Sequence, residues 1–189
     1  MQIILASGSP RRKELLEQAG YIFTVEVSDA DENVAACKPA DMVEELSLRK
    51  ATAVAKLHGD GKDFCRIIGS DTIVVKDEKV LGKPEDEEDA KRMLRELSGR
   101  EHEVYTGVTV LTVEAGKVVK TQQFHECTKV VMREISEEEI EKYVASGEPM
   151  DKAGAYGIQG RAGIFISGIY GDYYNVVGLP ICHLTTVLS

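Results

Sequence analysis

The order in which strand-like and helix-like segments follow one another constrains the fold of this chain most. Up to Gly99, short apolar segments typical of strands alternate with amphipathic segments typical of helices. After Gly99, several strand-like segments follow one another before the next helix. Alternation is typical of parallel strands joined by helices, whereas consecutive strands pair as antiparallel neighbours. The sequence therefore predicts an α/β protein built on a mixed sheet.

Caps and turn residues set the boundaries of these segments. Ser9 and Pro10 are typical of a helix start and Gly20 of a helix end, while S-E-E-E at residues 136–139 is a capping box. Helices are expected at residues 10–20, 41–58, 84–99, 136–145 and 181–189. Strands are expected at residues 2–6, 21–28, 66–75, 162–169 and on both sides of Ala115 and Gly116. Three connections separate them: an acidic loop at 28–33, a hairpin turn at 76–79 and a glycine-rich loop at 147–160.

The length and charge of the chain limit the partners it can have. With 189 residues it can form a single domain over residues 1–189, or two small lobes around a cleft. The formal net charge of -9 argues against nucleic-acid binding, which requires a basic face. An anionic substrate would therefore need a local cluster of cations, helped by a divalent metal ion.

The sequence predicts a cytoplasmic protein that does not enter a membrane. It contains no apolar run long enough to cross a bilayer, and no secretory leader precedes its first strand. Its four cysteines are widely separated and form no CxxC pair, which favours thiols in a reducing compartment over disulfides or a zinc site. The oligomeric state stays open between a monomer and a homodimer.

Three consecutive cations, Arg11, Arg12 and Lys13, begin the first helix of this acidic chain. The helix dipole makes positive charge unfavourable in a first turn. The strand, loop and helix start around Ser9 also direct backbone N–H groups toward one point, an arrangement that suits phosphate. Two interpretations stay open: a solvated basic patch, or a site where a bound polyphosphate makes the cations favourable.

Asp71 is the clearest candidate for chemistry, because it lies inside the apolar strand at residues 66–75. A buried carboxylate is costly unless it is paired, binds a metal ion or lies in a cleft. The alternative is a hairpin position that faces water. Lys50, Lys83 and Glu32 add two cations and a second acid, although each could also be a solvated side chain. Together these residue types suit metal-assisted phosphoryl transfer.

Longer motifs between Leu5 and Pro180 resemble a known family. They are LASGSPRRKELL, GSDTIVV, VLGKPEDEEDAKRMLRELSGREHEVYTGV, GEPMDKAGAYGIQGRAG and GDYYNVVGLP. In this order they resemble the Maf family of nucleoside triphosphate pyrophosphatases. The resemblance implies hydrolysis of a triphosphate to the monophosphate and pyrophosphate with a divalent cation, Mg²⁺ or Mn²⁺. It also implies an elongated mixed α/β fold of two lobes around a central cleft, shared with the inosine-triphosphate pyrophosphatases.

The resemblance assigns roles to individual residues. Asp71 matches the proposed general base, and Glu32 and Asp71 match acidic positions associated with the metal ion. The phosphate-binding positions of the family correspond to Ser9, Arg12, Lys50 and Lys83.

Three further residues, Arg11, Thr72 and Gln159, resemble the subfamily that prefers dTTP and UTP. The other subfamily carries Trp, Gln and Glu at these positions and prefers 7-methyl-GTP. The amide of Gln159 offers both a donor and an acceptor, which suits the imide edge of thymine or uracil.

Two other functions stay open from the sequence. Members of the family were first described as inhibitors of septum formation, so a non-enzymatic nucleotide-binding regulator of cell division is one alternative. A house-cleaning hydrolase of modified pyrimidine triphosphates is the other, because the sequence does not separate modified pyrimidines from dTTP and UTP.

Overall fold

The structure is a computed structural model that describes residues 2–35, 37–58 and 64–189. The chain divides into two compact units. Unit 1 consists of Met1–Asp71, Thr106–Glu126 and Gly178–Ser189, and unit 2 of Thr72–Tyr105 and Cys127–Val177. The two lobes implied by the family resemblance correspond to these units. The single domain over residues 1–189 and the central cleft stay predictions.

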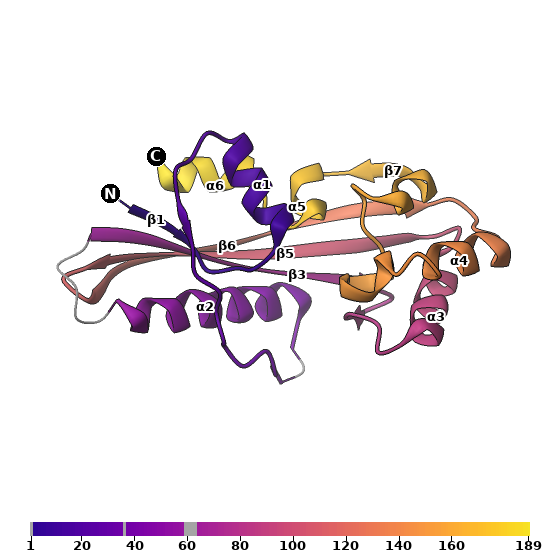
Figure 1. The fold of residues 1–189 in the computed structure, drawn as a ribbon, viewed down its shortest axis with the longest axis horizontal. Helices are drawn as coiled ribbons and strands as arrows, with labels where there is room; N and C mark the ends of the chain where they lie inside the picture. The colour runs from indigo at the N-terminus through magenta and orange to yellow at the C-terminus, as the bar shows by residue number, and fades with distance from the viewer. Residues whose placement is uncertain (1, 36, 59–63) are drawn as a thin grey trace. The chain divides into compact units, whose positions relative to one another are not determined.

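A mixed sheet forms the centre of the fold (Figure 1). Its strands are β1 (Gln2–Leu5), β2 (Thr24–Val25), β3 (Phe64–Lys76), β4 (Lys79–Leu81), β5 (Glu101–Glu114), β6 (Lys117–Met132) and β7 (Ile166–Tyr170). They follow the order β2-β1-β3-β5-β6-β7, with β4 beside β3. β1 pairs in parallel with β2 and β3, whereas β4 is antiparallel to β3 and β7 to β6. The predicted mixed α/β class is therefore confirmed.

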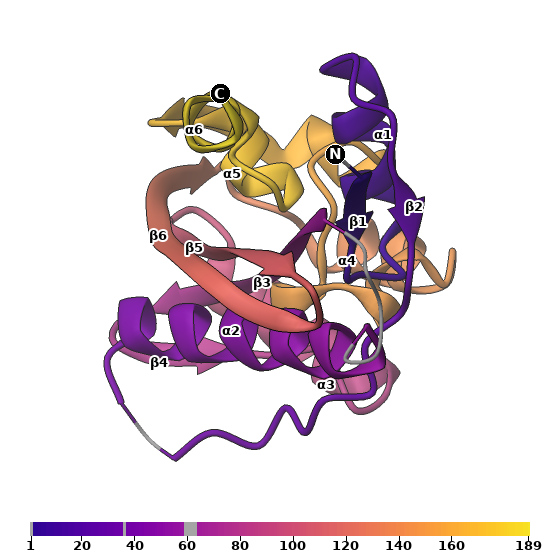
Figure 2. The same cartoon turned by 90° about the vertical axis from the view of Figure 1, so that its left-hand side faces the viewer.

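The helices of unit 1 lie on both faces of its strands. α2 (Pro39–Leu57) covers one face and α6 (Ile181–Leu188) the other, while α1 (Pro10–Gln18) follows β1 (Figure 2). α2 presents small side chains to the sheet, so its backbone can approach closely. The buried cluster it forms with β1, β3 and β5 contains Ile4, Ala6, Ala51, Val54, Ala55, Cys65, Ile67, Leu111 and Val113. No helix among the described residues is both long and apolar enough to cross a membrane.

Unit 2 packs α3 (Glu87–Leu97) and α4 (Glu137–Val144) around a core that includes Leu94, Ile140 and Phe165. The predicted capping box at the start of α4 is confirmed, because Ser136 and Glu139 each bond the backbone nitrogen of the other. Three short 3₁₀ turns and a helix complete the unit: η1 (Glu148–Asp151), η2 (Ala153–Ala155), η3 (Arg161–Phe165) and α5 (Tyr173–Val177).

Two of the predicted strands were partly wrong. β2 is far shorter than residues 21–28, because it lies at the sheet edge and its apolar neighbours Ile22 and Val27 are exposed to solvent. The segment 162–169 begins as η3 and becomes β7 only at Ile166. Ala162 and Phe165 are buried with helical spacing, which overrides the strand-like composition.

Close packing of α2 on β3 depends on Gly69. A Cβ atom at this position would lie 2.2 Å from the carbonyl oxygen of Ser47 and 2.9 Å from the Cβ of Ala51. The position therefore accepts only glycine without a shift of α2. Because Lys50 precedes Ala51 and Asp71 follows Gly69 by two residues, this contact also sets the distance between two predicted site residues.

We expect Gly69→Ala to destabilise the protein by about 1–3 kcal/mol, because a methyl group has no room beneath α2. The melting temperature, followed by circular dichroism, should fall by several degrees. Gly82→Ala is the control, since a Cβ there meets nothing within 4 Å. Equal melting temperatures for the two variants would contradict this account of the packing.

Candidate active site

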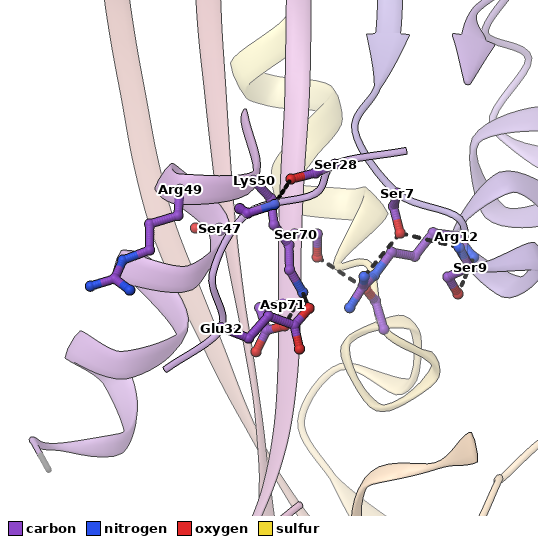
Figure 3. A network of polar contacts seen from close by, with 12 residues as sticks. Ser7, Ser9, Arg12, Ser28, Glu32, Ser47, Arg49, Lys50, Ser70 and Asp71 are labelled. Carbon is purple, nitrogen blue, oxygen red and sulfur yellow. Dashed lines mark hydrogen bonds and ion pairs between the residues drawn. The ribbon is translucent and has the colours of Figure 1, made fainter. Parts of the chain in front are cut away.

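The ammonium group of Lys50 joins two carboxylates in unit 1 (Figure 3). Its Nζ lies 2.6 Å from Oδ1 of Asp71 and 2.8 Å from Oε1 of Glu32. The Lys50 and Asp71 side chains are 14% and 13% exposed, whereas that of Glu32 is 65% exposed. The contact thus links a largely buried ion pair to an acid at the surface, and it brings together three of the residues predicted from the sequence.

Arg49 holds the loop that carries Glu32. Its Nη1 donates to the carbonyl oxygens of Asp31 at 3.3 Å and of Asn33 at 2.8 Å, on either side of Glu32. The Asp31 carboxylate accepts from the backbone and side-chain nitrogens of Asn33, which lowers the pKa of Asp31 and closes a local turn. The loop conformation therefore directs Glu32 to Lys50, whereas the carboxylate of Asp31 stabilises the turn.

The start of α1 forms the second part of the candidate site. Ser9 caps the helix, with its Oγ 3.5 Å from the backbone nitrogen of Arg12. The Arg12 guanidinium folds back, so that Nε donates to the carbonyl oxygen of Gly178 at 2.8 Å and Nη1 to Oγ of Ser7 at 3.1 Å. Burial lowers the pKa of Arg12, and the negative charge of Asp71 opposes that shift. Arg12 thus lies within electrostatic reach of the Lys50–Asp71 pair.

Sequence reasoning missed Ser7, Ser70 and Gly178, which fix this part of the site. Oγ of Ser70 donates to the carbonyl oxygen of Gly178 at 3.2 Å, and Oγ of Ser7 accepts from the backbone nitrogen of Ser9 at 3.2 Å. Ser7 shares a motif with Ser9, so the motif itself was a usable signal. Gly178 likewise lies in the motif GDYYNVVGLP, but its contact with Arg12 carries no sequence signal, because 166 residues separate the two and only the tertiary fold joins them.

The remaining predicted residues divide between the units. Arg11 is half-buried at the start of α1 in unit 1, whereas Thr72, Lys83 and Gln159 belong to unit 2. Lys83 follows β4 and is exposed, and Gln159 is exposed in the loop after η2. The structure therefore brings Lys50, Asp71 and Glu32 into direct contact and leaves the roles of the other residues as predictions.

Glu32 and Asp71 offer the hard oxygen donors that Mg²⁺ and Mn²⁺ prefer. Both carboxylates already meet one cation, the Lys50 ammonium. In the part of the chain that the structure describes, no group of three or more His, Cys, Asp or Glu side chains is placed to hold a metal ion. Because Mg²⁺ is commonly held by one or two carboxylates together with substrate phosphates, this pair fits an ion that binds with a triphosphate.

Comparison with known proteins finds relatives along the whole chain. A family model described as Maf-like protein matches residues 2–189. Proteins named dTTP/UTP pyrophosphatase from Bacillus cereus (strain B4264) and Bacillus mycoides (strain KBAB4) are 52% and 53% identical over 189 residues, which cover 100% of this chain and 94% of each relative. A solved structure of a nucleoside-triphosphatase / dITP/XTP pyrophosphatase from Mycobacterium abscessus matches 71% of this chain and 76% of its own, with a TM-score of 0.43 and 16% identity.

We expect Arg12→Lys to lower the melting temperature by several degrees although it keeps the positive charge. An ammonium group cannot reproduce the fork that donates to Gly178 and Ser7, and loss of a hydrogen bond from a charged donor costs about 1.5–3 kcal/mol. Lys13→Gln is the matched control from the same basic triplet, because Lys13 is exposed and its ion pair with Glu17 spans 3.7 Å. If Arg12→Lys has the same melting temperature as the wild type, these two contacts contribute nothing to the stability of the fold.

Proposed function

The chain belongs to the Maf family, and from this premise we propose that it hydrolyses dTTP and UTP to the nucleoside monophosphate and pyrophosphate. Relatives named dTTP/UTP pyrophosphatase, 52–53% identical over the full chain, support this choice of substrate. One feature of unit 1 carries the proposal: the Lys50–Asp71–Glu32 contact, with the Arg12 guanidinium in electrostatic reach of it.

Unit 1 supplies cations and donors for the phosphate groups. The start of α1 carries partial positive charge, so Ser9 and Arg12 would donate to phosphate oxygens there. The ammonium of Lys50 has three N–H donors, of which the two carboxylates take two. The third would remain for a phosphate oxygen, so Lys50 would hold Asp71 and bind substrate at the same time.

Asp71 would act as the general base. Lys50 contacts only its Oδ1, and Oδ2 has no hydrogen-bond partner among the described residues, so Oδ2 can take the proton of an attacking water. That water would attack the α-phosphorus, and the bond to the bridging oxygen of pyrophosphate would break. Bound at Glu32 and Asp71, Mg²⁺ or Mn²⁺ would neutralise negative charge on the triphosphate.

Unit 2 would contribute the remaining contacts with substrate. Lys83, in the motif LGKP, would stabilise the charge that develops on the leaving pyrophosphate. Gln159, together with Arg11 and Thr72, would read the imide edge of thymine or uracil. The motif match supports both roles, and so does the solvent exposure of Lys83 and Gln159.

We also propose that the enzyme works in the cytoplasm. Nucleoside triphosphates and Mg²⁺ would be at hand there, and reducing conditions would suit its cysteines. No disulfide links the cysteines of the described residues.

We expect the wild-type protein to release pyrophosphate, and not orthophosphate, from dTTP and UTP only when a divalent cation is present. Asp71→Asn keeps the size of the side chain but removes the proton acceptor, so kcat should fall about 100-fold or more. Asp29→Asn is the matched control, because it neutralises an exposed acid of the same unit.

Three results would contradict parts of this proposal. Orthophosphate as the first product, or full activity in excess chelator, would reject the metal-dependent pyrophosphatase. A kcat for Asp71→Asn within a few-fold of the wild type would remove Asp71 from the role of base. Tight binding of dTTP without turnover would favour a regulator of cell division.

A further inference from the structure

The turn that carries Gln159 is closed by a backbone hydrogen bond, whereas the Gln159 side chain is exposed to solvent. Residues 157–160 form a four-residue turn closed by a hydrogen bond of 3.0 Å from the nitrogen of Gly160 to the carbonyl oxygen of Gly157. Gln159 occupies the third position. Its side chain is exposed and makes no hydrogen bond with any residue that the structure describes. The Gln159 amide is therefore available to bind a base. Its position depends on the residues that pack against the turn.

Glu148, the first residue of η1, contacts the C-terminal end of this turn. Its Oε2 accepts from the backbone nitrogen of Arg161 at 3.1 Å. A Cβ atom on Gly160 would lie 2.1 Å from its Oε1. The carboxylate thus lies directly against the two residues that follow Gln159.

Lys152 contacts the N-terminal end of the turn. Its Nζ donates to the carbonyl oxygen of Glu148 at 2.8 Å, and its side chain is 15% exposed. A Cβ atom on Gly157 would lie 2.6 Å from its Cε, so the aliphatic part of Lys152 packs beneath the first residue of the turn. Both ends of the turn therefore pack against one short segment, residues 148–152.

Tyr143 connects this segment to the core of unit 2. Its hydroxyl donates to Oε1 of Glu148 at 3.1 Å, and its buried ring packs edge-on against Phe165. Burial and then the negative charge of Glu148 raise the pKa of Tyr143, so the hydroxyl keeps its proton and remains a donor at neutral pH. The Glu148 carboxylate is thus the link between the core and the turn.

We propose that Glu148 is a positioning residue for base choice, which sets the place of the Gln159 amide and thereby the preference for pyrimidine over purine triphosphates. The inference rests on the proposed function. Thymine and guanine present a carbonyl oxygen and an N–H in the same order, but the guanine edge lies farther from the sugar. A single amide that pairs with these two shared groups cannot separate the bases by hydrogen-bond type, so the distance at which Gln159 is held would separate them.

The test compares kcat/KM for dTTP and dGTP in Glu148→Gln, with Glu138→Gln as the matched control on the exposed face of α4. A glutamine replaces one of the two acceptor oxygens by an NH₂ donor, so it cannot accept from Tyr143 and Arg161 through two separate oxygens as the carboxylate does. The dTTP to dGTP ratio should fall about tenfold in Glu148→Gln and stay unchanged in the control. The inhibition constant of inorganic tripolyphosphate, which has no base, should stay at the wild-type value.

A second comparison asks whether Glu148 acts through Gln159. In a Gln159→Ala background the reading amide is gone, so adding Glu148→Gln should change the ratio no further. A further change there would overturn the inference, as would an unchanged ratio in the folded Glu148→Gln variant. Weaker tripolyphosphate binding in step with the ratio would also overturn it, because it would indicate a general structural role.

Tyr143→Phe provides an independent variant if Glu148→Gln does not fold. It removes one donor from Glu148 and keeps the carboxylate, so the ratio should fall in the same direction by a smaller factor. An unchanged ratio would again overturn the inference. Absence of dTTP hydrolysis in the wild type would instead overturn the proposed function and this inference with it, and the wild-type measurement alone distinguishes that case.

Discussion

The ammonium of Lys50 is the charge on which the candidate active site depends. It separates and holds two carboxylates that would otherwise repel each other, and it does so where Asp71 is largely withdrawn from water. For fully buried ion pairs, loss of one partner costs about 3–5 kcal/mol, because the other charge stays unpaired. The absence of a side chain at Gly69 lets α2 approach β3 closely enough for this contact to form.

The two units divide the proposed work according to what nucleotides share and how they differ. Phosphate groups are common to every nucleoside triphosphate, and the cations predicted to bind them lie mainly in unit 1, around α1 and α2. The base differs from one substrate to the next, and Gln159 with its supports belongs to unit 2. A change in the 148–161 segment could therefore alter substrate choice without altering the groups proposed for the chemistry.

Much of the fold could be predicted because local signals agreed with the final packing. The caps at Ser9 and Ser136 and the hairpin turn at Asp77 and Glu78, both with positive φ, lie where the sequence places them. Prediction failed at β2 and η3, where exposure and burial spacing override composition.

The sequence predicted several residues of the candidate site but not the contacts between them. Lys50, Asp71 and Glu32 were identified from the sequence, but their contact depends on the packing of α2 on β3 and on the hydrogen bonds of Arg49 to the acidic loop. The contact of Arg12 with Gly178 and the support of Gln159 by Glu148 are likewise tertiary.

The central claim is that water attacks the α-phosphorus of the nucleotide. Hydrolysis of dTTP in water enriched in ¹⁸O, with the products separated and weighed by mass spectrometry, tests this claim most directly. The account predicts one ¹⁸O atom in dTMP and none in pyrophosphate. Label in pyrophosphate would place the attack on the β-phosphorus, and label in orthophosphate would indicate stepwise removal of phosphate; either result would contradict the account.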